Sequence, residues 1–155
     1  MRELRLTGYG ARGVAGTGLI PEVAMDLAAA FGTFLEGGRV LLAADTRYSS
    51  GMFAAAVRSA LMGAGCDVVD AGICPTPMLQ WLIPELKVSG GISITGAHNP
   101  QGWNSISLFD AEGGFLNPSE GEVVLEVMRG GEFRKALWND IGRLEVLEDR
   151  RMDVY

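Results

Sequence analysis

Near-continuous apolar runs of strand length divide the first hundred residues of the chain. They are RVLLAA at 39–44, CDVVDAG at 66–72 and GGISIT at 90–95. Runs of this kind are typical of strands that are buried on both faces of a sheet. A fourth run, NSISLFD at 104–110, alternates apolar and polar positions, so we expect it nearer the edge of the sheet. GRLEVLE at 142–148 predicts a late strand.

Helical spacing of apolar residues, together with start and stop residues, predicts four helices between these strands. Prolines at first-turn positions and serine or asparagine caps mark the starts, and glycines such as Gly65 mark the ends. Trp81 falls at a core position of the third helix, and Pro84 makes the end of that helix irregular. The predicted helices span residues 21–36, 50–64, 76–86 and 118–129.

The N-terminal segment differs from the rest of the chain. Residues 3–6 form a short predicted strand, and the glycine-rich sequence GYGARGVAGTG at 8–18 is interpreted as a loop. The glycines do not follow a strong strand in the dinucleotide-binding pattern, so they are a weak signal for a nucleotide site.

A strand, a loop and a helix follow one another three times along the chain, without a repeat of fixed period. This order is typical of an α/β fold. We therefore predict a three-layer α/β/α sandwich with a mostly parallel mixed sheet. Residues 1–148 form one domain in this prediction, and DRRMDVY at 149–155 begins a further segment.

Composition excludes several classes of protein. The formal net charge of −6 argues against a nucleic-acid surface, which needs clustered lysine and arginine. No apolar run approaches the roughly 20 residues of a membrane span, and the N-terminus lacks the apolar core of a signal peptide. Cys66, Cys74 and the single His98 cannot form a zinc site. We expect a cytoplasmic protein without membrane or nucleic-acid partners.

Loops that follow the predicted strands should share one rim of the sheet, where ligands bind in such folds. DTRYSS, CPTP and TGAHNP all leave strands, and Arg12 and Arg47 lie in the glycine-rich loop and in DTRYSS. Two arginines near helix N-termini would suit an anion such as phosphate. Arg12 as a solvated loop charge, and Arg47 paired with Asp45 or with a helix end, are equally compatible with the sequence.

His98 lies between a β-branched strand and an asparagine–proline turn. A histidine in such a loop is either a chemical group or a structural imidazole that bonds to backbone, and the sequence leaves both open. Pro75 and Pro77 are interpreted as architectural. The residues on the N-terminal side of His98 are Gly96 and Ala97, whose side chains have no reactive group.

The order of these motifs resembles the N-terminal domain of the α-D-phosphohexomutases, the phosphoglucomutase/phosphomannomutase family. YGARG at 9–13 is similar to the family's Tyr-Asp-Ile-Arg-Gly, and TGLIPEVAMDLAAAFGTFL to its Leu-Thr-Pro-Glu helix. The stretch from ADTRYSS to CPTP matches in order and spacing. TGAHNP at 95–100 stands where the family has Thr-Ala-Ser-His-Asn-Pro. The resemblance covers nearly the whole chain.

The resemblance implies an isomerase of carbohydrate metabolism with four domains around a cleft. Such enzymes move a phosphoryl group between two positions of a hexose through a sugar bisphosphate, with a phosphoserine and Mg²⁺. By position, Tyr9 and Arg12 would face substrate or phosphate, and Asn99 would support the phosphorylated loop. His98 would transfer a proton or orient the loop, and Arg47 would brace the loop.

Three positions depart from the family pattern. The phosphoserine position is Ala97, which cannot form a phosphate ester. The family's lysine falls at Ser107, and its aspartate before Ile-Arg-Gly falls at Gly10. Thr95 lies roughly 6–7 Å along a strand from the serine position, too far to replace it. Ser105 and Ser107 could do so only if strand pairing placed them over the loop.

The family's Asp-x-Asp-x-Asp magnesium cluster belongs to its second domain, and no Asp-x-Asp occurs in this chain. The resemblance therefore implies Mg²⁺ for the family and no complete metal site here. DRRMDVY at 149–155 resembles the linker into that second domain. We expect a phosphohexomutase-type domain I whose phosphoryl transfer is lost or impaired, with hexose phosphate, sugar bisphosphate and the other mutase domains as partners. The alternative is a non-catalytic sugar-phosphate-binding or regulatory module.

Overall fold

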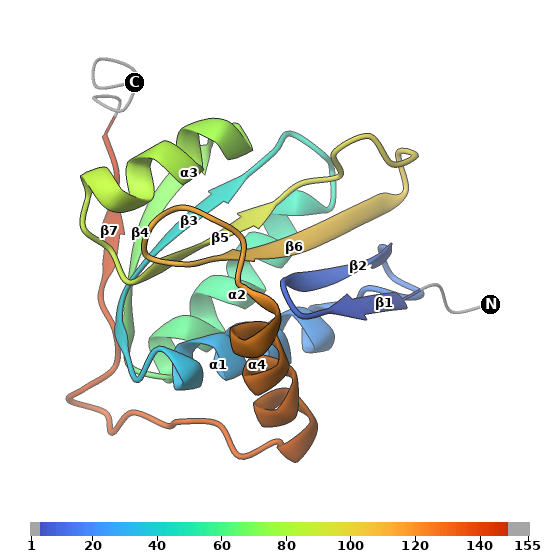
Figure 1. Cartoon of the computed structure of the whole chain (residues 1–155). Coiled ribbons are helices and arrows are strands. Elements are labelled where there is room, and N and C mark those ends of the chain that lie inside the picture. Colours follow the sequence, from blue (N-terminus) through green and yellow to red (C-terminus); the bar gives the residue numbers. More distant parts are fainter. Residues whose placement is uncertain (1–3, 149–155) are drawn as a thin grey trace.

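The computed structural model describes residues 4–148, and seven of its strands form a single sheet (Figure 1). The predicted linker at 149–155 lies outside the described residues. Four helices connect or flank the strands, and the sheet order is β1-β2-β6-β5-β3-β4-β7. The elements are β1 (Leu4–Thr7), β2 (Gly10–Val14), α1 (Pro21–Phe34), β3 (Gly38–Ala44), α2 (Ser50–Gly63), β4 (Cys66–Ile73), α3 (Thr76–Glu85), β5 (Gly90–Ile94), β6 (Trp103–Phe109), α4 (Pro118–Gly130) and β7 (Leu144–Val146).

The sheet is mixed, as predicted. β3 pairs in parallel with β4 and β5, and β4 pairs in parallel with β7. The three other pairings, β1 with β2, β2 with β6 and β5 with β6, are antiparallel. Five strands consequently run in one direction, while β1 and β6 run in the other.

Helices cover both faces of the sheet and make the predicted three layers. Figure 1 shows α3 on one side of the sheet and α1, α2 and α4 on the other. Alternate residues of β3 supply both cores, because successive side chains of a strand point to opposite faces. Val40 and Leu42 pack with Leu27 and Val57, whereas Leu41 packs under α3 in a second cluster. Trp81 packs against this second cluster, which confirms its interpretation as a packing residue.

The N-terminal glycine-rich segment is not wholly a loop, and this prediction was wrong. Residues 10–14 form β2, which pairs with β1 through a two-residue turn at Gly8 and Tyr9. Gly10 has a φ of 155°, and a Cβ there would lie 2.0 Å from the carbonyl oxygen of Ile106. The absence of a side chain thus allows two backbones to approach closely enough to pair.

β6 alternates in burial as predicted but does not lie near the edge. It is the third strand from one side, because the β1–β2 hairpin adds two further strands beyond it. Its alternation has a different origin. Asn104, Ile106 and Leu108 are buried in the core, while Ser105 and Ser107 are only partly covered.

Helix ends follow the sequence closely, with one change in capping. α1 ends at Phe34 rather than near Glu36. α4 begins after Asn117, whose side chain accepts a hydrogen bond from the Glu120 amide at 2.9 Å. Ser49 occupies the N-cap of α2 without a side-chain cap bond. Its hydroxyl accepts a hydrogen bond from Asn104 Nδ2 at 2.9 Å, because β6 lies directly against this helix start. Within residues 4–148, no helix has the length and apolar character needed to cross a membrane.

Candidate functional site

One arginine, Arg47, holds the loop at residues 95–100 that leaves β5. Arg47 itself lies in the loop that follows the neighbouring strand β3. Arg47 donates hydrogen bonds to the carbonyl oxygens of Asn99 and Pro100 at 2.6 Å each and of Trp103 at 3.0 Å. A longer contact of 3.4 Å reaches the carbonyl of Ala97. A Cβ at Gly96 would lie 1.6 Å from Arg47 Nε, so the guanidinium occupies the space beside this glycine. Arg47 therefore fixes the loop backbone.

Asp45 supports both Arg47 and the loop. Its Oδ2 accepts a hydrogen bond from the Gly96 amide at 2.8 Å and lies 3.7 Å from Arg47 Nε. Its Oδ1 accepts from the Arg47 amide at 3.0 Å and from the Ser50 hydroxyl. Burial raises the pKa of Asp45, but the hydrogen bonds from Ser50, Gly96 and Arg47 outweigh it, and the pKa is lowered overall.

Ala97 is exposed and has a φ of 47°, in the left-handed region that non-glycine residues rarely adopt. Its amide donates to Thr95 Oγ1 at 3.0 Å. The bonds of Arg47 and Asp45 on either side of Ala97 compensate the conformational cost. The result is a loop whose shape is imposed by its surroundings rather than by its own residue preferences.

His98 and Asn99 behave differently within this loop. The His98 side chain is exposed and does not line the pocket described below. Asn99 folds back, and its Nδ2 donates to the Gly96 carbonyl at 3.0 Å. Of the two residues, only Asn99 combines a structural bond with a position in the pocket wall.

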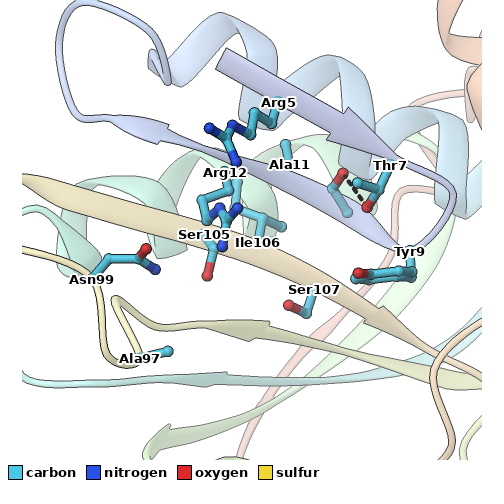
Figure 2. A pocket seen from close by; sticks show the side chains of 11 residues that line it. Arg5, Thr7, Tyr9, Ala11, Arg12, Ala97, Asn99, Ser105, Ile106 and Ser107 are labelled. Atoms are coloured by element: carbon cyan, nitrogen blue, oxygen red, sulfur yellow. Dashed lines mark hydrogen bonds between the residues drawn. The ribbon is translucent and has the colours of Figure 1, made fainter. Parts of the chain in front are cut away.

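A pocket of about 190 Å³ opens between the N-terminal hairpin, β6 and this loop (Figure 2). Ala97 and Asn99 enter it from the loop, and the strands supply the other walls. Most of the polar groups in it are arginine guanidinium groups and hydroxyls. The lining residues from the strands and their turn are Arg5, Thr7, Tyr9, Gly10, Ala11, Arg12, Ser105, Ile106 and Ser107.

Strand register explains why these side chains meet. Arg5 pairs with Arg12, and Arg12 pairs with Ser105, so the three form one row across β1, β2 and β6. In the next row Thr7 pairs with Gly10, and Gly10 with Ser107. Paired residues of adjacent strands point to the same face. Gly10 and Ser107 of this second row both line the pocket, with Gly10 contributing only backbone.

The structure brings most of the predicted site residues together and leaves two, His98 and Arg47, outside the pocket wall. Tyr9, Arg12, Ala97, Asn99 and Ser107 all line the pocket. Arg47 does not line it, because its guanidinium is bonded to the loop carbonyls. Of the interpretations of Arg47 that the sequence left open, the contacts match its pairing with Asp45 and its bracing of the loop.

Arg5 and Thr7 are pocket residues that the sequence reasoning missed. Arg5 lies opposite Arg12 only because residues 10–14 form a strand, and the sequence predicted a loop over 8–18. The missed signal is the pair of short alternating segments on either side of Gly8-Tyr9, a spacing typical of a hairpin. With a two-residue turn, residues 5 and 12 become direct neighbours.

The residues present do not make a magnesium site. No carboxylate lines the pocket among the described residues. Across residues 4–148, no group of three histidine, cysteine or acidic side chains could hold a metal ion. Mg²⁺ prefers carboxylate and phosphate oxygens, so its protein ligands would have to come from elsewhere.

Comparison with known proteins gives a consistent result. Residues 4–135 match the family model described as phosphoglucomutase/phosphomannomutase, alpha/beta/alpha domain I. A probable phosphoglucosamine mutase of Pyrococcus horikoshii is 36% identical over 142 residues, which are 92% of this chain and 32% of that protein. A phosphoglucomutase/phosphomannomutase of Thermococcus kodakarensis is 40% identical over 141 residues, 88% of this chain and 31% of that protein.

Two solved structures superpose on 97% of the chain with a TM-score of 0.80 each. One, from Thermus thermophilus, is 31% identical and is covered over 34% of its length. The other, a phosphoglucomutase/phosphomannomutase family protein of Burkholderia thailandensis, is 24% identical and covered over 35%, and it supports the fold alone. The chain thus spans about a third of the length of these relatives.

Proposed function

Since this chain belongs to the phosphoglucomutase/phosphomannomutase family as its α/β/α domain I, we propose that it forms one wall of a hexose-phosphate site whose phosphoryl transfer is lost or impaired. The relatives are about three times as long, so a complete site would need further domains. In this proposal the pocket between the hairpin, β6 and the 95–100 loop receives a phosphate group.

The observation that carries the proposal is the methyl group of Ala97 in the pocket wall. The family resemblance places the phosphoryl-carrying serine at this position. The loop keeps an elaborate support from Arg47 and Asp45, yet the side chain it presents has no oxygen. Without a hydroxyl, no phosphate ester can form at this position.

Neighbouring hydroxyls are poor substitutes as carriers. Strand pairing does bring Ser105 and Ser107 into the pocket wall. The Ser105 hydroxyl donates a hydrogen bond to the Thr95 carbonyl oxygen at 2.5 Å, and Thr95 Oγ1 accepts one from the Ala97 amide. Within residues 4–148, no carboxylate or imidazole contacts either serine hydroxyl as a base. These serine hydroxyls therefore lack the general base that would activate them as nucleophiles.

The broader features of the family extend the proposal. A hexose phosphate or sugar bisphosphate would be the ligand, and the remaining mutase domains would be the structural partners. His98, exposed beside the pocket, would orient a ligand or transfer a proton, and Tyr9 and Asn99 would contact the ligand. Mg²⁺ would be held by residues outside the described part of this chain. The cytoplasmic location stays a prediction.

A second function, sugar-phosphate binding without chemistry, is favoured by the charge of the pocket. Arg5 and Arg12 reach the pocket, whose lining among residues 4–148 contains no carboxylate, and Ser107 replaces the lysine of the family pattern. Such a site can retain an anion while lacking the groups for transfer. A sensor or regulatory subunit would use it in this way.

The test is mutase turnover by the natural protein that carries this chain. The assay contains a hexose 1-phosphate, Mg²⁺ and a trace of hexose bisphosphate, with a serine-bearing family member as the reference. We expect turnover at least 100-fold below the reference, and a measurable gain in the Ala97→Ser variant. The Ala111→Ser variant, at an exposed turn position, controls for adding a hydroxyl.

Turnover comparable to the reference would overturn the proposal. Phosphopeptide mapping would then identify the oxygen that carries the phosphoryl group, with Ser105 and Ser107 as the first positions to inspect. Low turnover combined with saturable binding of a hexose phosphate would favour the binding function.

A further inference from the structure

Arg5 and Arg12 form an unusual pair on the N-terminal hairpin. They are direct register partners on antiparallel strands, a geometry that places their Cβ atoms about 4.5–5.5 Å apart on one face. Like charges directly opposite each other destabilise a sheet. Figure 2 shows both side chains at the same wall of the pocket.

Neither arginine is neutralised by a described residue. The ion pairs found within residues 4–148 belong to four other arginines, Arg39, Arg47, Arg58 and Arg129. The chain has an excess of acidic residues, 19 against 13 basic ones, so carboxylates are plentiful elsewhere. Two positive charges of an acidic protein meet in a pocket that no carboxylate of the described residues lines, which points to an anionic ligand.

The rest of the pocket suits a phosphate group. Ser105 lies beside Arg12 in the same row, Ser107 pairs with Gly10 in the next row, and both serines line the pocket. Asn99 adds an amide from the loop. The volume of about 190 Å³ is several times the ~30 Å³ that one water molecule occupies in the liquid, which leaves room for a phosphate and part of its carrier.

We propose that Arg5 and Arg12 act together as a two-arginine clamp for one phosphate group carried by the ligand. Planar guanidinium groups bind phosphate oxygens through paired, charge-assisted hydrogen bonds. Arg5 supplies the second positive charge that the chain lacks at Ser107. Because Ala97 carries no phosphoryl group, the phosphate in the clamp arrives with the ligand. This inference rests on the proposed function for the sugar part of the ligand, but the clamp is defined by phosphate alone.

The test measures binding and stability together. Titration calorimetry on the full chain uses inorganic phosphate, glucose 1-phosphate and glucose 6-phosphate, with unphosphorylated glucose as the uncharged probe. The variants are Arg5→Gln, Arg5→Lys and Arg12→Gln. Arg129→Gln, which removes an exposed arginine from α4, is the matched control for loss of one positive charge.

We expect glucose phosphates to bind in a salt-sensitive manner and glucose not to bind. Arg5→Gln and Arg12→Gln should each weaken binding by about tenfold or more, the usual effect of losing a hydrogen bond to a charged group. The affinity of Arg5→Lys should lie between those of Arg5→Gln and the parent. Lysine keeps the positive charge but lacks the planar guanidinium that makes two parallel hydrogen bonds. Arg129→Gln should bind as the parent does.

A thermal readout tests the clamp independently of the sugar. Without phosphate, Arg5→Gln should unfold at the same temperature as the parent or a higher one, since a repulsion is removed. Added inorganic phosphate should raise the unfolding temperature of the parent and leave that of Arg5→Gln almost unchanged.

The outcomes separate the clamp from the proposed function. Undiminished binding by Arg5→Gln, with loss in Arg12→Gln, would overturn the clamp and leave the hexose-phosphate site intact. No binding of any phosphate by the parent would overturn the clamp and the binding function together. Binding through both arginines combined with normal mutase turnover would overturn the impaired-transfer proposal and leave the clamp standing.

Discussion

Arg47 Nη2 donates a hydrogen bond to the carbonyl oxygen of Asn99 at 2.6 Å, although 52 residues separate the two in the sequence. The same guanidinium bonds Pro100 and Trp103, so the loops after β3 and β5 are joined through one side chain. The Arg47 guanidinium thereby supplies the hydrogen bonds that water would otherwise donate to these carbonyl oxygens. The shape of the 95–100 loop depends on this contact.

Replacement of Arg47 by alanine should destabilise the protein and loosen the loop. The side chain is only 19% exposed, and its removal leaves several carbonyls and the Asp45 carboxylate without their partner. We expect a loss of about 2–3 kcal/mol in the free energy of unfolding, measured by urea denaturation. Arg129→Ala, which breaks an exposed ion pair with Glu122, should cost below about 1 kcal/mol. Equal losses in the two variants would contradict the role of Arg47.

Asp45→Asn should produce a stability difference that depends on pH. The folded pKa of Asp45 is lowered, so its carboxylate contributes stability above the unfolded value near 3.9, and that contribution disappears as the pH falls through the folded pKa. The parent should therefore exceed Asp45→Asn in unfolding free energy at pH 7. The gap should narrow below about pH 4. Denaturation curves between pH 2.5 and 7 test this, with the exposed Asp26 on α1 mutated in the same way as control. A gap that stays constant across the range would refute the assignment.

Substitutions at Ala97 should reveal the left-handed backbone. A glycine relieves a conformational cost of roughly 1–2 kcal/mol but gains freedom in the unfolded chain, so Ala97→Gly should be neutral or stabilising by up to about 1 kcal/mol. Ala97→Val should destabilise, because a β-branched side chain tolerates positive φ poorly. Ala29→Gly inside α1 should instead cost about 1 kcal/mol. The same sign for both glycine variants would argue against the left-handed conformation.

Local pattern determined most of the framework. The apolar runs at 39–44, 66–72 and 90–95 became β3, β4 and β5, because a continuous run of this length is buried on both faces only in a covered sheet. Ser-Ile-Thr-Gly and Asp-Thr-Arg then had to leave those strands at one rim. The position of Ala97 in a strand-end loop, and its lack of a hydroxyl, were also readable from the sequence alone.

Tertiary structure alone decided which charges reach the pocket. Residues 10–14 have little strand character of their own and pair because Gly10 lets their backbone approach β6, a contact between segments almost a hundred residues apart. That pairing placed Arg5 opposite Arg12 and beside Ser105. Arg47, equally charged and equally near a strand end, was drawn under the loop by carbonyls that no local pattern identifies. The spacing of apolar and polar residues predicts whether a side chain is buried. The residue that this side chain contacts depends on strand order and register, which local spacing does not determine.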